Sequence, residues 1–440
     1  MFQTLRNAWK VTDIRKKILY TLFIVLIFRI GSAIPVPFVD LVHLKEMVSN
    51  DANNTAMQLL TLMSGGGFSD ASILALSITP YINASIIIQL LTVAIPALER
   101  MAQNGEEGRK KLGQITRYVT VILGLLLGIA YYFMVKNKYT AIAPVGQHGF
   151  AGFFVALTIV LCFTAGSALM MWLGEQINER GIGNGISILL FAGILSRLPN
   201  GFQLLYALVT SGVKAINGGN GGLGVKQIVM AFAIVVLVLA IIVLIVFMSN
   251  AERRIPIQYA KRTVGRKIYG GQNTFIPIKV NMSGVMPIIL AVSIVSMPSI
   301  LQQFFGWKDN WFLNMFHSNS WVYVGLYFLL IIGFAFFYVT IQYNPVEMAN
   351  NLRKNSGAIP GYRPGKPTVD YIRKVISKIT LIGALFLGVI ALCPSIFGIF
   401  TNIGLGLGGT SVMIVVGVAL ETMQQIESQI MMRHYKGFLE

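Results

Sequence analysis

Ten apolar stretches of about 20 residues follow one another along the chain, and they restrict its fold more than any other feature. A helix needs about 20 predominantly apolar residues to cross the hydrocarbon core of a bilayer. Hydrophobic residues make up 55% of the 440 positions and charged residues only 12%, a composition typical of a multi-pass membrane protein. We predict an all-α membrane protein whose transmembrane helices lie near residues 18–38, 76–96, 118–135, 152–173, 182–205, 225–248, 283–303, 321–342, 379–397 and 404–426.

Basic residues are distributed unevenly between the two sides of these predicted helices. Most of the 35 Lys and Arg residues fall in the N-terminal tail, in the loop after the second helix and in two long loops after the sixth and eighth helices. Lys and Arg stay on the cytoplasmic side of membrane proteins, so these segments are predicted to be cytoplasmic. An even number of helices then places both termini there, and the first apolar run is too long for a cleaved signal peptide.

Ten helices allow two halves of five with opposite orientation, a plan that is frequent in transport proteins. The polar segment "SGVKAINGGNGGLG", residues 211–224, would join them. We therefore predict an N-terminal half, residues 1–210, and a C-terminal half, residues 211–440, as pseudo-symmetric inverted repeats.

Residue types that carry catalysis or bind metals are not arranged for either task. No phosphate-binding loop of the form G-x-x-x-x-G-K-[ST] occurs. Cys162 and Cys393 both lie within apolar stretches, where cysteine packs as a small hydrophobic residue. We predict a protein that is not an enzyme, with no catalytic residue, no metal and no cofactor. The four histidines fall in loops or the tail without ligand spacing: His43, His148, His317 and His434.

Ionisable residues are nearly absent from the interiors of the predicted helices. Arg29, Arg197 and Glu421 are the main exceptions. Ion-coupled transporters usually bury such groups near the middle of the membrane. Their scarcity argues against a proton- or sodium-coupled mechanism, although a secondary transporter for a small solute remains an alternative.

The second apolar stretch, "SITPYINASIIIQLL", is unusually polar for a membrane helix. Asn83, Ser85 and Gln89 are costly against lipid but tolerable along a seam between helices or in a wet pore. Pro80 is expected to leave one backbone carbonyl of this helix without its donor. From the residues alone, ordinary packing between helices is the favoured explanation.

The segment before this helix, "SGGGFSDAS" at residues 64–72, is too polar to cross a bilayer. Irregular backbone at membrane depth is tolerated only inside protein or beside a water-filled cavity. Glycines 65–67 lower the cost of local rearrangement. We expect a mobile half-helix here.

The two long basic loops are longer than topology requires. Residues 251–287 alternate basic with apolar positions, which predicts a short hairpin, and residues 347–374 combine a short helical pattern with the Pro/Gly tip "IPGYRPG". Attraction of anionic lipid is one explanation for their charge. The other is a macromolecular partner such as ribosomal RNA, whose phosphates pair well with Arg.

Five segments together resemble the SecY family, the central subunits of the bacterial protein-conducting channel. They are similar in sequence, order and spacing, and the resemblance extends over essentially the whole chain. The segments are "SITPYINASIIIQLL", "WLGEQINERGIGNGISILLFAGI", "YAKR", "KVNMSGVMP" and "GAIPGYRPGKPT".

The resemblance implies a clamshell of two five-helix halves with a pore between them and a lateral opening toward lipid. It also implies a role for particular residues. A pore ring is expected at Ile78, Ile82, Leu190, Ile289 and Ile414, where Leu190 replaces the commoner isoleucine. A plug is expected at residues 56–70, including Leu60, Ser64, Gly65, Gly66, Gly67 and Phe68. A lateral gate is expected at Asn83, Ile86, Gln89, Ser293 and Met297. Docking cations are expected in the loops at residues 249–282 and 343–378, namely Arg253, Arg254, Lys261, Arg262 and Arg363.

The same resemblance implies a passive channel in the bacterial cytoplasmic membrane for unfolded polypeptides that carry an apolar signal. Energy would come from the SecA ATPase or from the ribosome, docked on the two basic loops. The expected partners are SecE and SecG, SecA, the ribosome, the polypeptide substrates and membrane lipids, with SecDF and a YidC-type insertase as possible additions. The alternatives are an inverted-repeat transporter of a small solute and an insertase or scaffold without a pore.

Overall fold

The computed structural model describes residues 6, 8–42, 44, 64–138, 149–218, 221–259, 262–264, 267–269, 273–305, 320–401 and 409–436. Helices dominate, and each of the ten predicted spans coincides with a helix or a broken helix. The spans correspond, in chain order, to α2 (Thr12–Gly31), α5 (Thr79–Ala94), α7 (Gly105–Phe133), α8 (Gly149–Arg180), α9 (Gly185–Leu195) with α10 (Leu198–Asn217), α11 (Gly221–Asn250), α12 (Met286–Phe305), α14 (Trp321–Gln342), α16 (Lys366–Thr401) and α17 (Gly409–Lys436).

Several of these helices can cross a membrane on length and composition. Among the described residues, five stretches each contain an apolar window long enough to do so alone. They lie in α7, α8, α11, α14 with the following short helix α15 (Pro345–Lys354), and α16. The helix α5 does so together with α6 (Pro96–Gln103), from which it is bent by 106°. The helix α9 is a shorter apolar helix.

Prolines explain where the helices break. Pro96 begins α6 and so marks the bend after α5, and Pro199 lies in the first turn of α10, which begins at Leu198 after the kink at residues 196 and 197. Pro80 also lies in the first turn of its helix, where no intrahelical donor is required. The expectation that Pro80 leaves a carbonyl unpaired within the span was therefore wrong. Instead it helps to begin α5.

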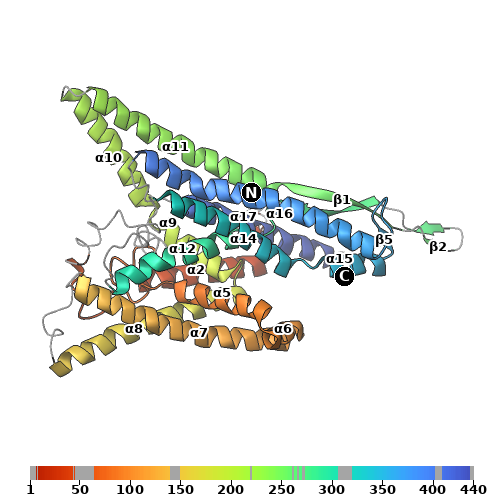
Figure 1. Cartoon of the computed structure of the whole chain (residues 1–440), viewed down its shortest axis with the longest axis horizontal. Helices are drawn as coiled ribbons and strands as arrows, with labels where there is room; N and C mark the ends of the chain where they lie inside the picture. The colour runs from red at the N-terminus through yellow and green to blue at the C-terminus, as the bar shows by residue number, and fades with distance from the viewer. Residues whose placement is uncertain are drawn as a thin grey trace.

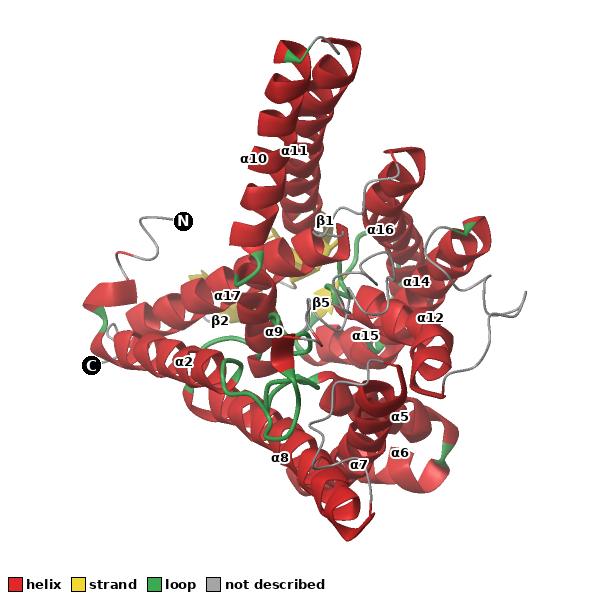
Figure 2. Cartoon of the chain, turned by 90° about the vertical axis from the view of Figure 1, so that its left-hand side faces the viewer, coloured by secondary structure: helices red, strands yellow, loops and turns green. Residues whose placement is uncertain are grey.

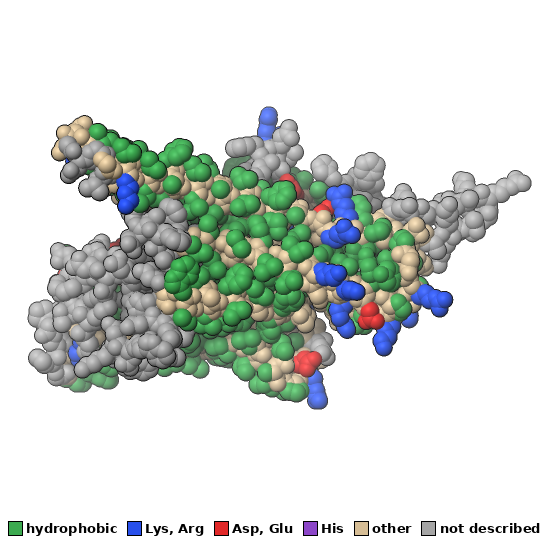
Figure 3. Space-filling model, turned by 45° about the horizontal axis from the view of Figure 1, so that its top comes forward, with side chains coloured by type: hydrophobic (Ala, Val, Ile, Leu, Met, Phe, Trp, Pro, Cys, Tyr) green, Lys and Arg blue, Asp and Glu red, His purple; other side chains and the backbone are tan. Residues whose placement is uncertain are grey.

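The helices form an elongated body with a small β domain at one end (Figure 1). At the opposite end, α10 and α11 lie side by side and project from the remaining helices (Figures 1 and 2). The predicted boundary between the halves, at residues 210 and 211, falls within α10. This helix ends at Asn217, and α11 begins at Gly221. A space-filling view shows hydrophobic side chains over the middle of one face, with Lys and Arg gathered toward the β end (Figure 3).

The two long basic loops fold into a single unit. In the first loop, β1 (Glu252–Tyr259) pairs antiparallel with β4 (Asn273–Lys279), and the short strands β2 (Arg262–Val264) and β3 (Lys267–Tyr269) pair beyond them, which confirms the predicted hairpin. The second loop contains the predicted short helix α15 (Pro345–Lys354) and then β5 (Gly357–Ala358), which pairs with β1. The sheet order is β4-β1-β5.

This sheet has an apolar core of its own. Strand β1 alternates buried Ile255 and Ile257 with exposed Arg254 and Pro256, as expected for a sheet with one solvated face. The buried face packs against α15 and the first turns of α16 through Leu352 and other apolar side chains. Asn344 caps α15 by accepting hydrogen bonds from the backbone N–H groups of residues 346 and 347. The described parts of the two loops thus form one packed extension of the C-terminal half.

Candidate functional site

The predicted ring residues converge. All five belong to one buried apolar cluster and are between 0% and 9% exposed. They come from different elements: one just before α5, one within α5, and one each from α9, α12 and α17. The backbone N–H of Ile82 donates to the carbonyl of Ile78 at 3.0 Å, so these two side chains are one helical turn apart, as their spacing predicted. The cluster joins helices of both halves, and we call the place where its five predicted ring residues meet the waist. These residues are Ile78, Ile82, Leu190, Ile289 and Ile414.

A glycine-rich turn fixes the helix that carries Leu190. A Cβ on Gly185 would lie 1.9 Å from the carbonyl oxygen of Gly174, so only glycine allows α9 to approach α8 this closely. The backbone N–H of Gly185 donates to the side chain of Asn178, and Asn184 caps α9. These contacts explain why glycine and asparagine occur together at the turn within the segment "WLGEQINERGIGNGISILLFAGI".

A polar vestibule lies on one side of the ring, which sequence reasoning did not predict. It is a pocket of about 220 Å³ whose walls include Leu190, Ile289 and Ile414 of the ring. A second pocket of about 250 Å³ shares part of this wall and reaches Lys279 of β4, toward the sheet. The polar residues of the first pocket stand near helix ends, where they resemble ordinary helix termini, except Glu421, which lies within α17. They are Asn184, Ser187, Ser283, Tyr338, Gln342 and Glu421.

The predicted lateral-gate residues occupy two different levels. Ile86 and Gln89 of α5 line a narrow pocket together with Met286 and Leu290 of α12, so α5 and α12 face each other here, beside the ring. Ser293 and Met297 of α12 are not among the residues that line this pocket. Ser293 donates to the carbonyl of residue 289 within its own helix, the Met297 side chain is 54% exposed, and α12 also contacts α7 and η1 (Met134–Lys138). Asn83 is half-buried on α5.

The described part of the predicted plug is a run of turns. Leu60, with the rest of residues 56–63, lies outside the described residues. The expectation of a half-helix at residues 64–70 was wrong, because these residues begin a run of turns that continues to residue 78, with an isolated bridge at Ser72. Gly65 and Gly66 have φ of 63° and 99°, and Ala71 and Ser77 also have positive φ. Each such residue interrupts a right-handed helix.

The described part of the predicted plug is hydrogen-bonded to residues of the N-terminal half. Arg29 and Ser196 both donate to the carbonyl of Gly65, at 3.1 and 3.2 Å. The hydroxyl of Tyr131 donates to the carbonyl of Phe68 at 2.8 Å, and the two rings meet edge to face at 4.9 Å. Phe68 is fully buried among side chains of α7 and α8.

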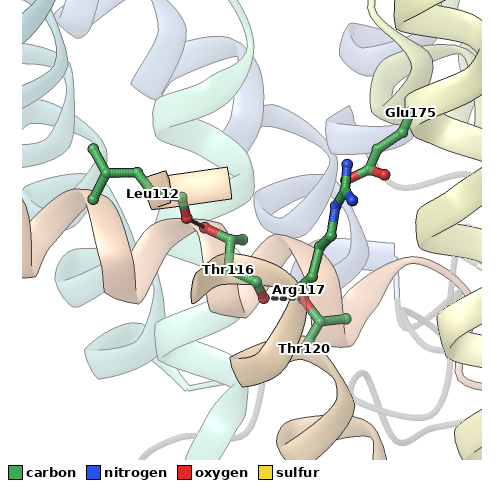
Figure 4. Close-up of polar contacts among 5 residues, drawn as sticks. All are labelled: Leu112, Thr116, Arg117, Thr120 and Glu175. Atoms are coloured by element: carbon green, nitrogen blue, oxygen red, sulfur yellow. Dashed lines mark hydrogen bonds and ion pairs between the residues drawn. The ribbon is translucent and has the colours of Figure 1, made fainter. Parts of the chain in front are cut away.

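Within the N-terminal half, further polar contacts tie these helices together. Arg117 of α7 donates to the carboxylate of Glu175 of α8 at 2.8 Å (Figure 4). Tyr20 of α2 donates to Gln176 of α8 at 3.1 Å. The hydroxyls of Thr116 and Thr120 donate to carbonyls of their own helix (Figure 4). The contacts of Arg117 and Tyr20 therefore link α7 and α2 to α8.

The predicted docking cations differ in their exposure and in their contacts with other side chains. The guanidinium of Arg254 is paired with Glu252 at 2.7 Å and lies 4.7 Å from the ring centre of Phe275, whereas Arg253 is exposed at the start of β1. Arg363 is exposed at the tip of the second loop. That tip is ordered, because Tyr362 stacks on Tyr371 at 4.3 Å and Thr368 donates to the carbonyl of Arg363 at 2.8 Å. Lys261 lies outside the described residues, and Arg262 is in β2.

Comparison with known proteins identifies relatives over the whole chain. A family model described as SecY matches residues 72–423. A protein of Streptomyces galbus and one of Halalkalibacterium halodurans are each 42% identical over all of both chains, and one of Mycobacterium bovis is 40% identical over all of both chains; each is named protein translocase subunit SecY.

Solved structures share the fold at low sequence identity. A structure described as that of a protein conducting channel superposes with a TM-score of 0.63 at 17% identity, over 94% of this chain and 92% of the other. Sec61 in a canine ribosome-channel complex superposes with a TM-score of 0.59 at 16% identity, over the same shares of each chain. The helices described above therefore adopt the architecture of these channels.

Proposed function

The chain belongs to the SecY family, and from this premise we propose that it is the pore subunit through which unfolded polypeptides cross the membrane of a bacterium. It also releases membrane-protein segments sideways into the lipid. As a channel subunit it provides a path and performs no reaction of its own. Its basic β end faces the cytoplasm together with both termini, because Lys and Arg gather on the cytoplasmic side.

The observation that carries this proposal is the apolar waist beside a polar vestibule. Side chains of both halves meet at the waist in one buried cluster. Apolar contacts are not directional, so the two halves can separate without leaving unpaired polar groups. Branched side chains around a narrow opening dewet it when it is empty and close around an extended chain when it is occupied. Ile78, Ile82, Leu190, Ile289 and Ile414 thus form the pore ring.

The vestibule receives the polypeptide from the cytoplasm. Asn184, Ser187 and Gln342 on its wall can exchange hydrogen bonds with a passing backbone of any sequence. A transporter for one small solute would instead need polar groups that converge on an enclosed site. Here the pocket continues toward Lys279 and the sheet, which favours a conduit.

The lateral gate lies between α5 and α12. The apolar helix of a signal enters between them and buries its surface in lipid. It opens the gate by binding the open state better than the closed one. Polar side chains such as Gln89 and Asn83 hold the closed seam with moderate strength, about 0.6 kcal/mol for each contact between membrane helices. Their polarity is tolerable because the seam adjoins a wet pore.

The plug closes the idle channel on the side of the ring away from the vestibule. Its turns place Gly65 against residue 193 of α9, where a Cβ would lie 3.1 Å from the Cα of that glycine. Residues 71–77 then lead from the plug to Ile78 of the ring. The plug leaves this position when a chain is threaded.

Driving force comes from partners docked on the sheet. Exposed Arg253 and Arg363 pair with phosphates of ribosomal RNA or with carboxylates of a motor, and both stand on one ordered unit. We infer that SecA and the ribosome bind here in turn and that SecE and SecG complete the channel. SecDF and a YidC-type insertase join it for some substrates.

The proposal is tested by reconstitution. The chain is placed in vesicles with SecE and SecG, and SecA, ATP and a signal-bearing precursor are added. Precursor should become protected from added protease only when ATP is present. Protection without ATP contradicts motor-driven translocation. Failure of translocation together with saturable uptake of one small solute would support the transporter instead.

A further inference from the structure

Two arginines interrupt otherwise uncharged stretches, and neither the ring nor the gate uses them. Arg29 lies in the last turn of α2, and Arg197 precedes α10. A charged side chain near the end of a membrane helix usually extends toward the interface. Both side chains instead contact the same short segment, residues 65–69, and this shared target requires an explanation.

Arg29 contacts the plug through its backbone. Its Nη1 donates to the carbonyl of Gly65 at 3.1 Å, and Ser196 offers that carbonyl a second donor at 3.2 Å. The conformation of Gly65, with φ of 63°, belongs to the left-handed region that glycine adopts readily. A hydrogen bond from a charged donor is stronger than one from a neutral group, so the bond from Arg29 is the stronger restraint on this carbonyl.

Arg197 contacts the plug one turn later. Its Nη2 lies 3.5 Å from the hydroxyl of Ser69, and a Cβ on Gly66 would lie 3.3 Å from the same nitrogen. Asp70 is near enough to interact electrostatically with Arg197, and so is Arg29. The carboxylate of Asp70 therefore offsets part of the repulsion between the two guanidinium groups. Without the plug, the two cations would face each other with less compensation.

We infer that Arg29 and Arg197 are positioning residues that hold the plug under the ring of the idle channel. This inference rests on the proposed function, because it takes residues 64–70 to be the plug. The two arginines act within the N-terminal half and set how strongly the closed state is preferred. They therefore set how strongly a signal must bind to open the channel, since a ligand shifts an equilibrium only by its differential affinity for the two states.

The experiment uses R29Q, R197Q and the double variant in the complex with SecE and SecG. Idle ion conductance is measured in planar bilayers, and translocation is measured for one precursor with an intact signal and one with a shortened apolar signal. Each single variant should raise idle conductance about tenfold. Translocation with the shortened signal should increase several-fold, while that with the intact signal stays within about twofold. R29K should restore much of the closed state, because lysine can still donate to the carbonyl of Gly65.

Control variants separate holding the plug from general damage. R15Q removes the same charge from the exposed opposite end of α2 and should leave conductance unchanged. S196A removes a neutral donor from the same carbonyl and should raise conductance about two- to threefold. Loss of translocation with both signals, at unchanged conductance, would mean damage to the fold and would overturn the inference.

A second comparison distinguishes this inference from the proposed function. The ring variant I82G/I289G is measured in the same bilayers. If it conducts ions while R29Q and R197Q remain as tight as the unaltered channel, the arginines do not hold the plug, although the ring stands. If the ring variant is tight while R29Q and R197Q conduct ions, the ring assignment is wrong and the arginines still hold the plug.

Discussion

The proposed pore ring at the waist and the proposed plug would close the channel in different ways. The waist is built from apolar side chains that both halves contribute, whereas the plug is held by hydrogen bonds from Arg29, Tyr131 and Ser196, all of the N-terminal half. Moving the halves apart separates the ring residues but leaves these hydrogen bonds intact. Opening the waist and releasing the plug are therefore separable events, and a variant can affect one without the other.

Covalent closure of the seam should give the largest effect, because it keeps the halves together. Ile86 and Met286 line one pocket from facing helices. After Cys162 and Cys393, which are free thiols, are replaced by Ala, I86C combined with M286C is oxidised and translocation is measured. Translocation should fall at least tenfold and recover on reduction. Each single cysteine variant serves as control, and full activity of the bridged form would show that the halves need not separate here.

Opening the ring should give the next largest effect. I82G combined with I289G removes two buried side chains from opposite halves, and the gap they leave admits water. We expect idle conductance to rise about tenfold or more in planar bilayers, with the plug contacts unaffected. The control is I382G, which places the same flexible residue in α16 at a side chain that is 58% exposed. Unchanged conductance of the ring variant would falsify the ring assignment.

Loosening the plug without changing its charge partners should give a smaller effect. G65A introduces a Cβ at a φ of 63°, where it also lies 3.1 Å from the Cα of Gly193; the left-handed conformation alone costs about 1–2 kcal/mol. Idle conductance should rise several-fold. G105A is a matched control, since Gly105 has a φ of 69° with open space around it. Equal effects of the two variants would remove the plug from the explanation.

The smallest effect on closure should come from the basic loops, because they contribute neither ring residues nor hydrogen bonds to the plug. R363E should weaken binding of SecA or the ribosome about tenfold at low salt, and the difference should shrink as salt increases. Idle conductance should stay unchanged, unlike in the ring and plug variants. R254Q is the comparison, and it should lose less because Arg254 is already paired with Glu252. Equal binding by R363E would leave this tip with a role in topology alone.

Periodicity and composition predicted the helices and the hairpin well. Each predicted apolar stretch is helical, and alternation in β1 correctly indicated a strand. The spacing of Ile78 and Ile82 predicted a shared helix face. Spacing alone does not determine which distant residues meet that face, so the convergence of Leu190, Ile289 and Ile414 had to be taken from the family resemblance.

Other features left no local signal. Strand β5 consists of two residues and forms by pairing with the edge of β1. Its own sequence therefore could not predict the strand or its partner. Pro80 looked like a helix breaker, since the start of α5 could not be located to within a few residues. Segment 64–78 forms turns because four of its residues have positive φ. The sequence indicates such a conformation only at the glycines, since other residues rarely adopt it. The vestibule residues other than Glu421 were overlooked because they stand near helix ends, and Glu421 was noted only as an ionisable residue in an apolar stretch.

One uninterrupted piece of backbone, residues 64–94, carries the proposed plug, two proposed ring residues and one wall of the proposed gate in that order. Residues 71–77 join the plug to Ile78, the N-cap residue of α5. A rotation of α5 about its axis would reach Ser77 first, whose φ of 52° lies in the strained left-handed region. A signal that turns α5 would therefore act on the plug through residues 71–77, so one stretch of backbone joins two closures that are each held by their own contacts.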